Sequence, residues 1–197
     1  GDRVLLLITK GFRDALRIAY QARPDIFAKE IILPEQLYER VIEVDERVRA
    51  DGTIEKQLEI ASVQPLIQQA KADGIEAVAI VFMHGYRFPQ HEARVAALAK
   101  EIGFTQISVS HQVSPLMKLV GRGDTTVVDA YLSPILRRYV DTVAEELQGV
   151  RLLFMQSNGG LTDAHRFQGK DAILSGPAGG VVGAVAVSRR AGFDRII

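Results

Sequence analysis

Three short apolar runs, separated by segments with helical spacing, limit the fold of this chain more than any other feature. The runs cover residues 4–8, 77–83 and 106–113. Their length is typical of buried strands, whereas the segments between them repeat apolar residues every three or four positions. A hairpin is also predicted at Asp51-Gly52, a dipeptide favoured in tight turns. Strands that alternate with helices predict a mostly parallel sheet covered by helices, which is an α/β fold.

Turn and capping residues give approximate bounds for the helices. A first helix is predicted over 12–22, closed by Pro24, and a second over 62–72. A third is predicted over 91–102, because a proline suits its start and Gly103 its end. The apolar residues expected to face inward from the first two helices are Phe12, Leu16 and Ala19, and Leu66, Ile67 and Ala70.

The pattern of apolar residues changes after Pro115, and we place a domain boundary there. A long amphipathic helix is predicted over 125–147, with a proline inside it. A strand that runs into a polar loop is predicted over 150–161, and a short strand over 171–174. A glycine-rich helix is expected to follow.

The composition argues against several classes of protein. The chain has 24 Lys and Arg residues against 24 Asp and Glu residues and no basic cluster, which argues against a nucleic-acid partner. No apolar run approaches the roughly 18 residues that a membrane helix needs, so no membrane partner is expected. The absence of cysteine excludes disulfides and thiolate metal sites, and it favours a cytoplasmic location.

The predicted last helix carries glycines where a helix normally avoids them, at Gly176, Gly179, Gly180 and Gly183. Each glycine inside a helix costs about 0.5–1 kcal/mol relative to alanine, so a specific role is expected. A P-loop is rejected because no Lys-Ser/Thr pair follows, and a dinucleotide fingerprint fits poorly because Ala178 replaces its first glycine. Gly179, Gly183 and Ala186 share one face, which predicts close backbone packing in a core or at a hinge.

Six motifs, in order along the chain, resemble those of the hydantoinase A/5-oxoprolinase family. They are TKGFRD (9–14), RPDIF (23–27), LYERVIEVDERV (37–48), DTTVVDAYLSP (124–134), LLFMQSNGGLT (152–162) and ILSGPAGGVVGA (173–184). The resemblance implies an internal fragment of an actin-like (ribonuclease H-like) ATPase domain. It implies an inserted α/β subdomain at 1–115, and a partial ATPase lobe at 116–197 that holds the long helix, the cleft loop and the hinge helix.

The resemblance also implies an activity. Family members couple ATP hydrolysis to the opening of cyclic amides such as 5-oxoproline or hydantoins, so ATP and Mg²⁺ are expected in the intact parent. Both phosphate loops are expected outside this segment, so the fragment alone is expected to hold no cofactor and to be inactive. The expected partners are a cyclic amide, a hydantoinase B-type subunit and further subunits of a homo- or hetero-oligomer. Two alternatives stay open: an ATP-using subunit of a ketone carboxylase, or a non-catalytic module that binds a small ligand or a partner.

Candidate site residues follow from the same resemblance, position by position, and no catalytic residue is assigned. Asn158, Gly159 and Gly160 resemble the loop that faces the nucleotide or substrate cleft. Gly176, Gly179 and Gly180 lie in the segment that resembles the connecting helix, and are cofactor-binding candidates with the loop. Lys10, Arg13, Asp14 and again Asn158 are candidates for substrate binding.

Other interpretations of these residues remain. The Asn158 amide both donates and accepts, and the backbone N–H groups of Gly159 and Gly160 can hold an anion, but a plain Asn-Gly turn explains the same residues. No metal site is predicted, because His84, His91 and His111 lack the paired spacing of zinc sites. A nucleotide-dependent oxidoreductase is a third function class.

One motif departs from the family pattern. Gly121-Arg122-Gly123-Asp124 stands where relatives often carry glutamate, arginine, threonine and serine. No role is therefore carried over to Gly121 or Asp124.

Overall fold

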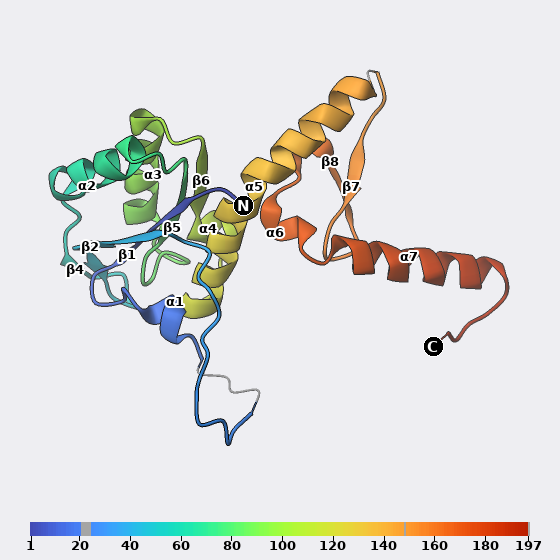
Figure 1. Ribbon diagram of the computed structural model, residues 1–197, viewed down its shortest axis with the longest axis horizontal. Coiled ribbons are helices and arrows are strands. Elements are labelled where there is room, and N and C mark those ends of the chain that lie inside the picture. The colour runs from blue at the N-terminus through green and yellow to red at the C-terminus, as the bar shows by residue number, and fades with distance from the viewer. Residues whose placement is uncertain (21–24, 148, 197) are drawn as a thin grey trace. The chain divides into compact units, whose positions relative to one another are not determined.

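The computed structural model describes residues 1–20, 25–147 and 149–196 (Figure 1). The chain divides into two compact units, Gly1–Tyr131 and Leu132–Ile197, and the boundary predicted near residue 115 lies inside the first. Helix α5 (Leu119–Glu146) begins in unit 1 and ends in unit 2, starting earlier than the predicted 125. No helix among the described residues is long and apolar enough to cross a bilayer.

Unit 1 contains a four-stranded parallel sheet, which confirms the predicted α/β fold. Its strands are β1 (Val4–Thr9), β2 (Arg40–Val44), β5 (Ala77–Val81) and β6 (Gln106–Val109), in the order β2-β1-β5-β6. The central strands β1 and β5 are fully buried, as their continuous apolar runs require. The third run was predicted as one strand over 106–113, which is wrong: after Val109 the chain turns into the short helix α4 (Ser110–Val113).

Each face of the sheet is covered by its own helices. Helices α2 (Ile60–Ala72) and α3 (Gln90–Ile102) pack on the face that presents Leu5 and Leu7. Helix α3 ends at Gly103, which has a φ of 97°, as predicted. Ile67 and Ala70 of α2 are buried as expected, but Leu66 is 49% exposed, so its predicted inward position is wrong. The opposite face presents Val4, Leu6 and Ile8 to α5.

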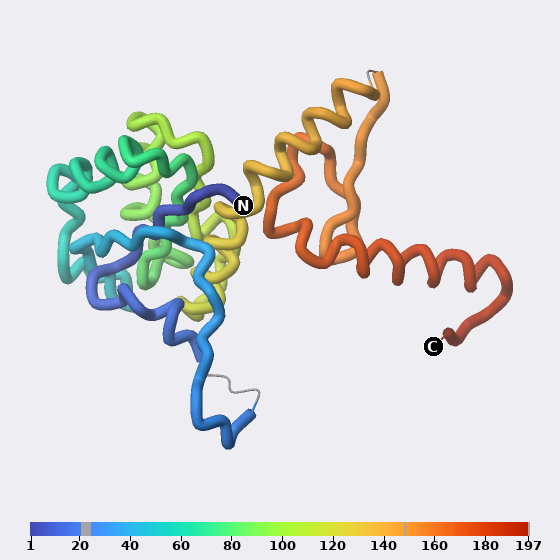
Figure 2. The backbone as a smooth tube through the Cα atoms, viewed as in Figure 1, coloured from blue at the N-terminus to red at the C-terminus, as the bar shows by residue number. Residues whose placement is uncertain are grey.

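The first predicted helix is much shorter than expected. Helix α1 covers only Ala15–Ile18, and Ala19 leaves the helical conformation with a φ of 49°. Pro24, predicted to close the helix, lies outside the described residues. Residues 25–39 run without regular helix or strand to β2 (Figure 2). One helical turn covers less of the sheet than a full helix, and this leaves a hollow beside α5.

A small hairpin follows β2. Strands β3 (Arg47–Val48) and β4 (Ile54–Lys56) pair in an antiparallel manner, as the Asp51-Gly52 dipeptide predicts. Gly52 has a φ of 94°, a conformation that favours glycine, and Asp51 Oδ1 accepts a hydrogen bond from Thr53 N.

Unit 2 consists of the C-terminal part of α5, a hairpin and two further helices. The predicted strand and loop over 150–161 form β7 (Leu153–Met155) and a turn into β8 (Leu161–Asp163). A 3₁₀ turn, η1 (Ala164–Arg166), precedes α6 (Gly169–Ala172) and the glycine-rich α7 (Ser175–Arg190). The strand predicted over 171–174 is wrong: the Asp171 carbonyl accepts hydrogen bonds from both N and Oγ of Ser157 instead of joining a sheet.

Candidate functional site

The carboxyl ends of β1 and β5 lie next to each other at a topological switch point of the sheet. The chain passes from β1 to β2 on one side, whereas β5 lies on the other side of β1 and leads to β6. In open parallel sheets, ligands bind in the crevice beyond such strand ends. Because β1 ends at Thr9, the motif at 9–14 begins at this edge.

Lys10, Arg13 and Asp14 follow β1, but only two of them share a hollow. Arg13 and Asp14 line an open hollow of about 500 Å³ together with Glu43. Lys10 is exposed, and its Nζ lies 3.6 Å from Asp45 Oδ2. Two carboxylates in the hollow disfavour an anionic ligand, because Arg13 is the one cation among its lining residues. Substrate binding by these three residues stays a prediction.

Next to this edge, a series of buried hydrogen bonds connects the ends of β1 and β5 to helix α3. Thr9 Oγ1 accepts a hydrogen bond from Met83 N at 2.9 Å and donates one to Glu46 Oε1. The other oxygen of Glu46 lies 2.7 Å from His91 Nδ1, and His91 Nε2 lies 3.3 Å from Gln57 Oε1. Thr9, Glu46 and His91 are all at most 4% exposed. Their polar groups therefore bind one another rather than solvent.

A second buried network is centred on Arg122, which has no exposed surface. Its guanidinium donates to Ser110 Oγ (2.9 Å) and to four carbonyl oxygens, of Leu116 (2.6 Å), Met117 (3.1 Å), Phe82 (2.6 Å) and Met83 (3.2 Å). Burial lowers the pKa of Arg122, and the charge of Glu92 acts in the opposite direction. The network ties the start of α5 to the end of β5.

Glu92 supplies the negative charge of this network and is also completely buried. Its Oε1 accepts hydrogen bonds from Phe82 N (2.8 Å) and Ser110 Oγ (2.5 Å). Its Oε2 accepts from His111 N (3.1 Å) and lies 2.6 Å from His111 Nδ1. These contacts join Glu92 to the end of β5 and to α4.

The three histidines singled out from the sequence have separate partners. His84 Nδ1 lies 2.6 Å from the Val48 carbonyl, whereas His91 and His111 pair with Glu46 and Glu92. Across the described ranges, no group of three or more His, Cys, Asp or Glu side chains is arranged to hold a metal ion.

In unit 2 the loop at 157–160 forms a closed turn. Gly159 N donates to the Gln156 carbonyl at 2.9 Å, and Gly160 N donates to Asn158 Oδ1 at 2.8 Å. Gly159 has a φ of 81°. The two N–H groups predicted to hold an anion are thus engaged inside the turn, as the Asn-Gly turn interpretation expects. The assignment of Asn158, Gly159 and Gly160 to the nucleotide or substrate cleft stays a prediction.

A groove of about 340 Å³ lies between this loop and the start of α7. It is lined by Ser157, Asn158, Gly159, Leu174, Pro177, Ala178, Val181 and Val182. Gly176, Gly179 and Gly180 are not among these lining residues, and their role as cofactor-binding residues stays a prediction.

The close backbone packing predicted for α7 is not formed within the described residues. A Cβ added at Gly176, Gly180 or Gly183 would meet no atom within 4 Å, and one at Gly179 would meet the Met155 side chain at 3.6 Å. The hinge role of α7 stays a prediction.

Replacing Gly159 with alanine is expected to destabilise unit 2 by about 1–2 kcal/mol, because an alanine Cβ opposes the left-handed conformation. Val182 Cγ2 would also lie 3.2 Å from the new Cβ. Amide hydrogen exchange in β7 and β8 measures the effect. The control is Gly180→Ala, where nothing opposes a Cβ, and equal exchange in the two variants would contradict the prediction.

Comparison with known families assigns the chain. The sequence model of the hydantoinase/oxoprolinase N-terminal region matches residues 1–103, and the hydantoinase/oxoprolinase model matches residues 122–197. The chain belongs to the hydantoinase/oxoprolinase family. This confirms the resemblance carried by the six motifs.

Individual members of the hydantoinase/oxoprolinase family are similar along nearly the whole chain. 5-Oxoprolinase 1 of Arabidopsis thaliana is 42% identical over 93% of this chain, which spans 16% of that protein. Caprolactamase subunit alpha of Pseudomonas jessenii is 32% identical over 100% of this chain and 30% of its own length. The crystal structure of the ATP-dependent caprolactamase from that organism superimposes with a TM-score of 0.81 at 30% identity, over 98% of this chain and 30% of the other.

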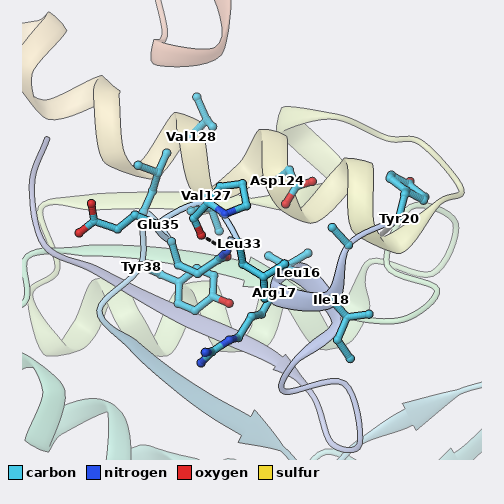
Figure 3. A pocket seen from close by; sticks show the side chains of 14 residues that line it. Leu16, Arg17, Ile18, Tyr20, Leu33, Glu35, Tyr38, Asp124, Val127 and Val128 are labelled. Carbon is cyan, nitrogen blue, oxygen red and sulfur yellow. Dashed lines mark hydrogen bonds between the residues drawn. The ribbon is translucent and has the colours of Figure 1, made fainter. Parts of the chain in front are cut away.

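Sequence reasoning missed a third hollow in this family member, between α1, residues 33–38 and α5 (Figure 3). Its polar rim includes Tyr38 and Asp124, neither of which was a candidate. The one signal in the sequence was that both residues lie in family motifs, at 37–48 and 124–134. No pattern within either motif points to the other.

Proposed function

We propose that this chain is part of a longer enzyme that uses ATP to hydrolyse cyclic amides. The observation that carries the proposal is similarity along nearly the whole chain to proteins named 5-oxoprolinase and caprolactamase, one of them ATP-dependent. The chain spans 16% and 30% of the two curated relatives, so the remaining parts of such an enzyme would complete the site.

The proposed reaction begins by making the amide oxygen a leaving group. An unstrained lactam resists water, and bound ATP supplies the phosphoryl group that is placed on the amide oxygen. Water then adds to the amide carbon, and the ring C–N bond breaks as nitrogen takes a proton, which leaves an acyl phosphate. A second water adds to the same carbon, and phosphate leaves with the former amide oxygen, so both oxygens of the new carboxylate come from water. The enzyme must hold the amide oxygen in line with the phosphoryl group and exclude other acceptors.

The groove in unit 2 is our candidate for contact with the nucleotide or substrate. Its loop presents the exposed Asn158, whose Oδ1 is engaged with Gly160 N but whose amide nitrogen has no partner among the described residues. That nitrogen can donate to a phosphate or carbonyl oxygen. The groove has no carboxylate among its lining residues, so we assign the Mg²⁺ ligands to other parts of the enzyme.

We further propose two domains that divide near residue 115, with α7 as the hinge helix of the second. The relative named subunit alpha supports assembly with a second, hydantoinase B-type subunit. The absence of cysteine supports a cytoplasmic location.

The test is ADP release by the full-length protein with 5-oxoproline, hydantoin or caprolactam. We expect ADP formation to depend on one of these rings and to match ring opening one to one. The proposal would be overturned if the rate of ADP release were the same with and without each of these cyclic amides, or if rings were opened without ATP.

The 197-residue chain alone is expected to release no ADP above the buffer rate, because no P-loop or other phosphate loop was found in its sequence. A single-turnover assay with radiolabelled ATP checks this. Turnover by the isolated chain would show that its own residues complete the phosphate site.

A further inference from the structure

The hollow beside α5 exists because α1 is a single turn. In an α/β layer a full helix normally covers the sheet next to its neighbour. Here the turn Ala15–Ile18 and the irregular residues 33–38 leave a space of about 370 Å³ against α5. Figure 3 shows side chains from all three segments around it. The whole hollow lies within unit 1.

The hollow is mainly apolar, and the polar and charged side chains in its lining are those of Arg17, Tyr20, Glu35, Gln36, Tyr38 and Asp124. Leu16, Leu33, Val127 and Val128 supply apolar surface. Tyr38 is half-buried, and burial followed by the charge of Asp14 raises the pKa of its phenol, so the hydroxyl remains a hydrogen-bond donor at neutral pH.

Asp124 supplies the acceptor. Partial burial raises the pKa of its carboxyl, and the residue still lies open to solvent at the rim. Within the described ranges, neither the Asp124 carboxylate nor the Tyr38 hydroxyl makes a hydrogen bond or ion pair. The two groups nevertheless interact electrostatically. A donor and an acceptor thus share one apolar space.

A cyclic amide has the matching chemistry. Its methylene ring is apolar, and its amide is fixed in the cis form, so that the N–H and C=O groups lie side by side. A donor and an acceptor beside an apolar surface bind such a group with both hydrogen bonds formed. A cyclic ketone would leave the Asp124 carboxylate without a donor.

We propose that this hollow binds the ring of a cyclic amide, with Tyr38 donating to the carbonyl oxygen and Asp124 accepting from the ring N–H. The proposal rests on the proposed function and names where the substrate ring is held. The volume of about 370 Å³ accommodates a ring of five to seven members.

The test is titration of the 197-residue chain, with its Leu and Val methyl groups labelled, with 2-pyrrolidinone and with caprolactam, followed by NMR. We expect saturable shifts at Leu16, Leu33 and Val127. N-methyl-2-pyrrolidinone, which has no N–H, is expected to bind about tenfold more weakly, the loss of one hydrogen bond to a charged group.

The variants Asp124→Ala and Tyr38→Phe are each expected to weaken lactam binding by roughly five- to tenfold. Asp141→Ala, an exposed carboxylate on the same helix, is the matched control and is expected to bind like the unaltered chain. Because Asp124 lies at the rim, its replacement leaves the core unchanged.

Three results would overturn the assignment: no lactam binding, shifts confined to Leu174, Val181 and Val182 in the groove of unit 2, or tighter binding of an alkylammonium ion than of a lactam. None of these results would contradict the proposed function, because the proposed function is tested separately, by ring-dependent ADP release from the full-length protein.

Discussion

Replacing Arg122 with methionine is expected to lower the free energy of unfolding of unit 1 by about 3–5 kcal/mol, the usual loss when one partner of a buried charged network is removed. The change leaves the carbonyls of Leu116, Met117, Phe82 and Met83 without this donor. It also leaves Glu92 buried without the opposing charge. Both effects act in the same direction, since methionine fills the space but supplies no donor.

Urea denaturation followed by circular dichroism measures the effect of Arg122→Met. The matched control is Arg94→Met on α3, where the side chain is exposed and a change within about 0.5 kcal/mol is expected. A loss below 1 kcal/mol at Arg122 would mean that its hydrogen bonds do not hold α5 against β5.

Replacing Gly169 with alanine is expected to destabilise unit 2 by about 2–3 kcal/mol, an overpacking effect that side-chain movement cannot relieve. The new Cβ would lie 2.8 Å from the backbone N of Ser133 and 2.9 Å from Leu132 Cβ. The hydrogen bond from Gly169 N to Ser133 Oγ, 2.9 Å long, would be strained as well. Gly169 therefore permits α6 to approach the backbone of α5.

Gly183→Ala is the matched control for Gly169→Ala, and both are measured by thermal unfolding of the 197-residue chain. No atom lies within 4 Å of a Cβ at Gly183, so alanine there is expected to stabilise α7 by up to about 1 kcal/mol. A reversed order of stability would mean that α7, and not α6, makes the close backbone contact.

These glycines show what helical spacing can and cannot predict. Small residues at Gly179, Gly183 and Ala186 lie on a helix as expected, but within the described residues a close approach to another backbone is made at Gly169. Spacing identifies a face of a helix, and it does not identify what lies opposite. Gly169 has no such spacing, because α6 is a single turn.

Local patterns were sufficient for the buried elements of unit 1. The strands β1 and β5 follow from continuous apolar runs, and α3 follows from its periodicity and from Gly103. They were not sufficient at 106–113, since His111 N donates to Glu92 Oε2 and Ser110 donates to the same carboxylate. The position at which β6 ends is therefore decided by Glu92, which lies on another element of the chain.

The candidate site was predictable in part. The motif at 9–14 lies at the switch point because the strand before it was predicted correctly, and Asn158 lies in the turn that its dipeptide favours. Tyr38 and Asp124 could not be paired from the sequence, because the hollow between them depends on the early end of α1.

The most direct test of the proposed reaction follows the oxygen of the amide. The full-length protein is supplied with ATP and a cyclic amide labelled with ¹⁸O at its carbonyl, in unlabelled water, and both products are analysed by mass spectrometry. Our account predicts that the released phosphate carries one ¹⁸O for each ring opened, because the amide oxygen accepts the phosphoryl group and leaves with it. Label that remains entirely in the ring-opened carboxylate would contradict the account.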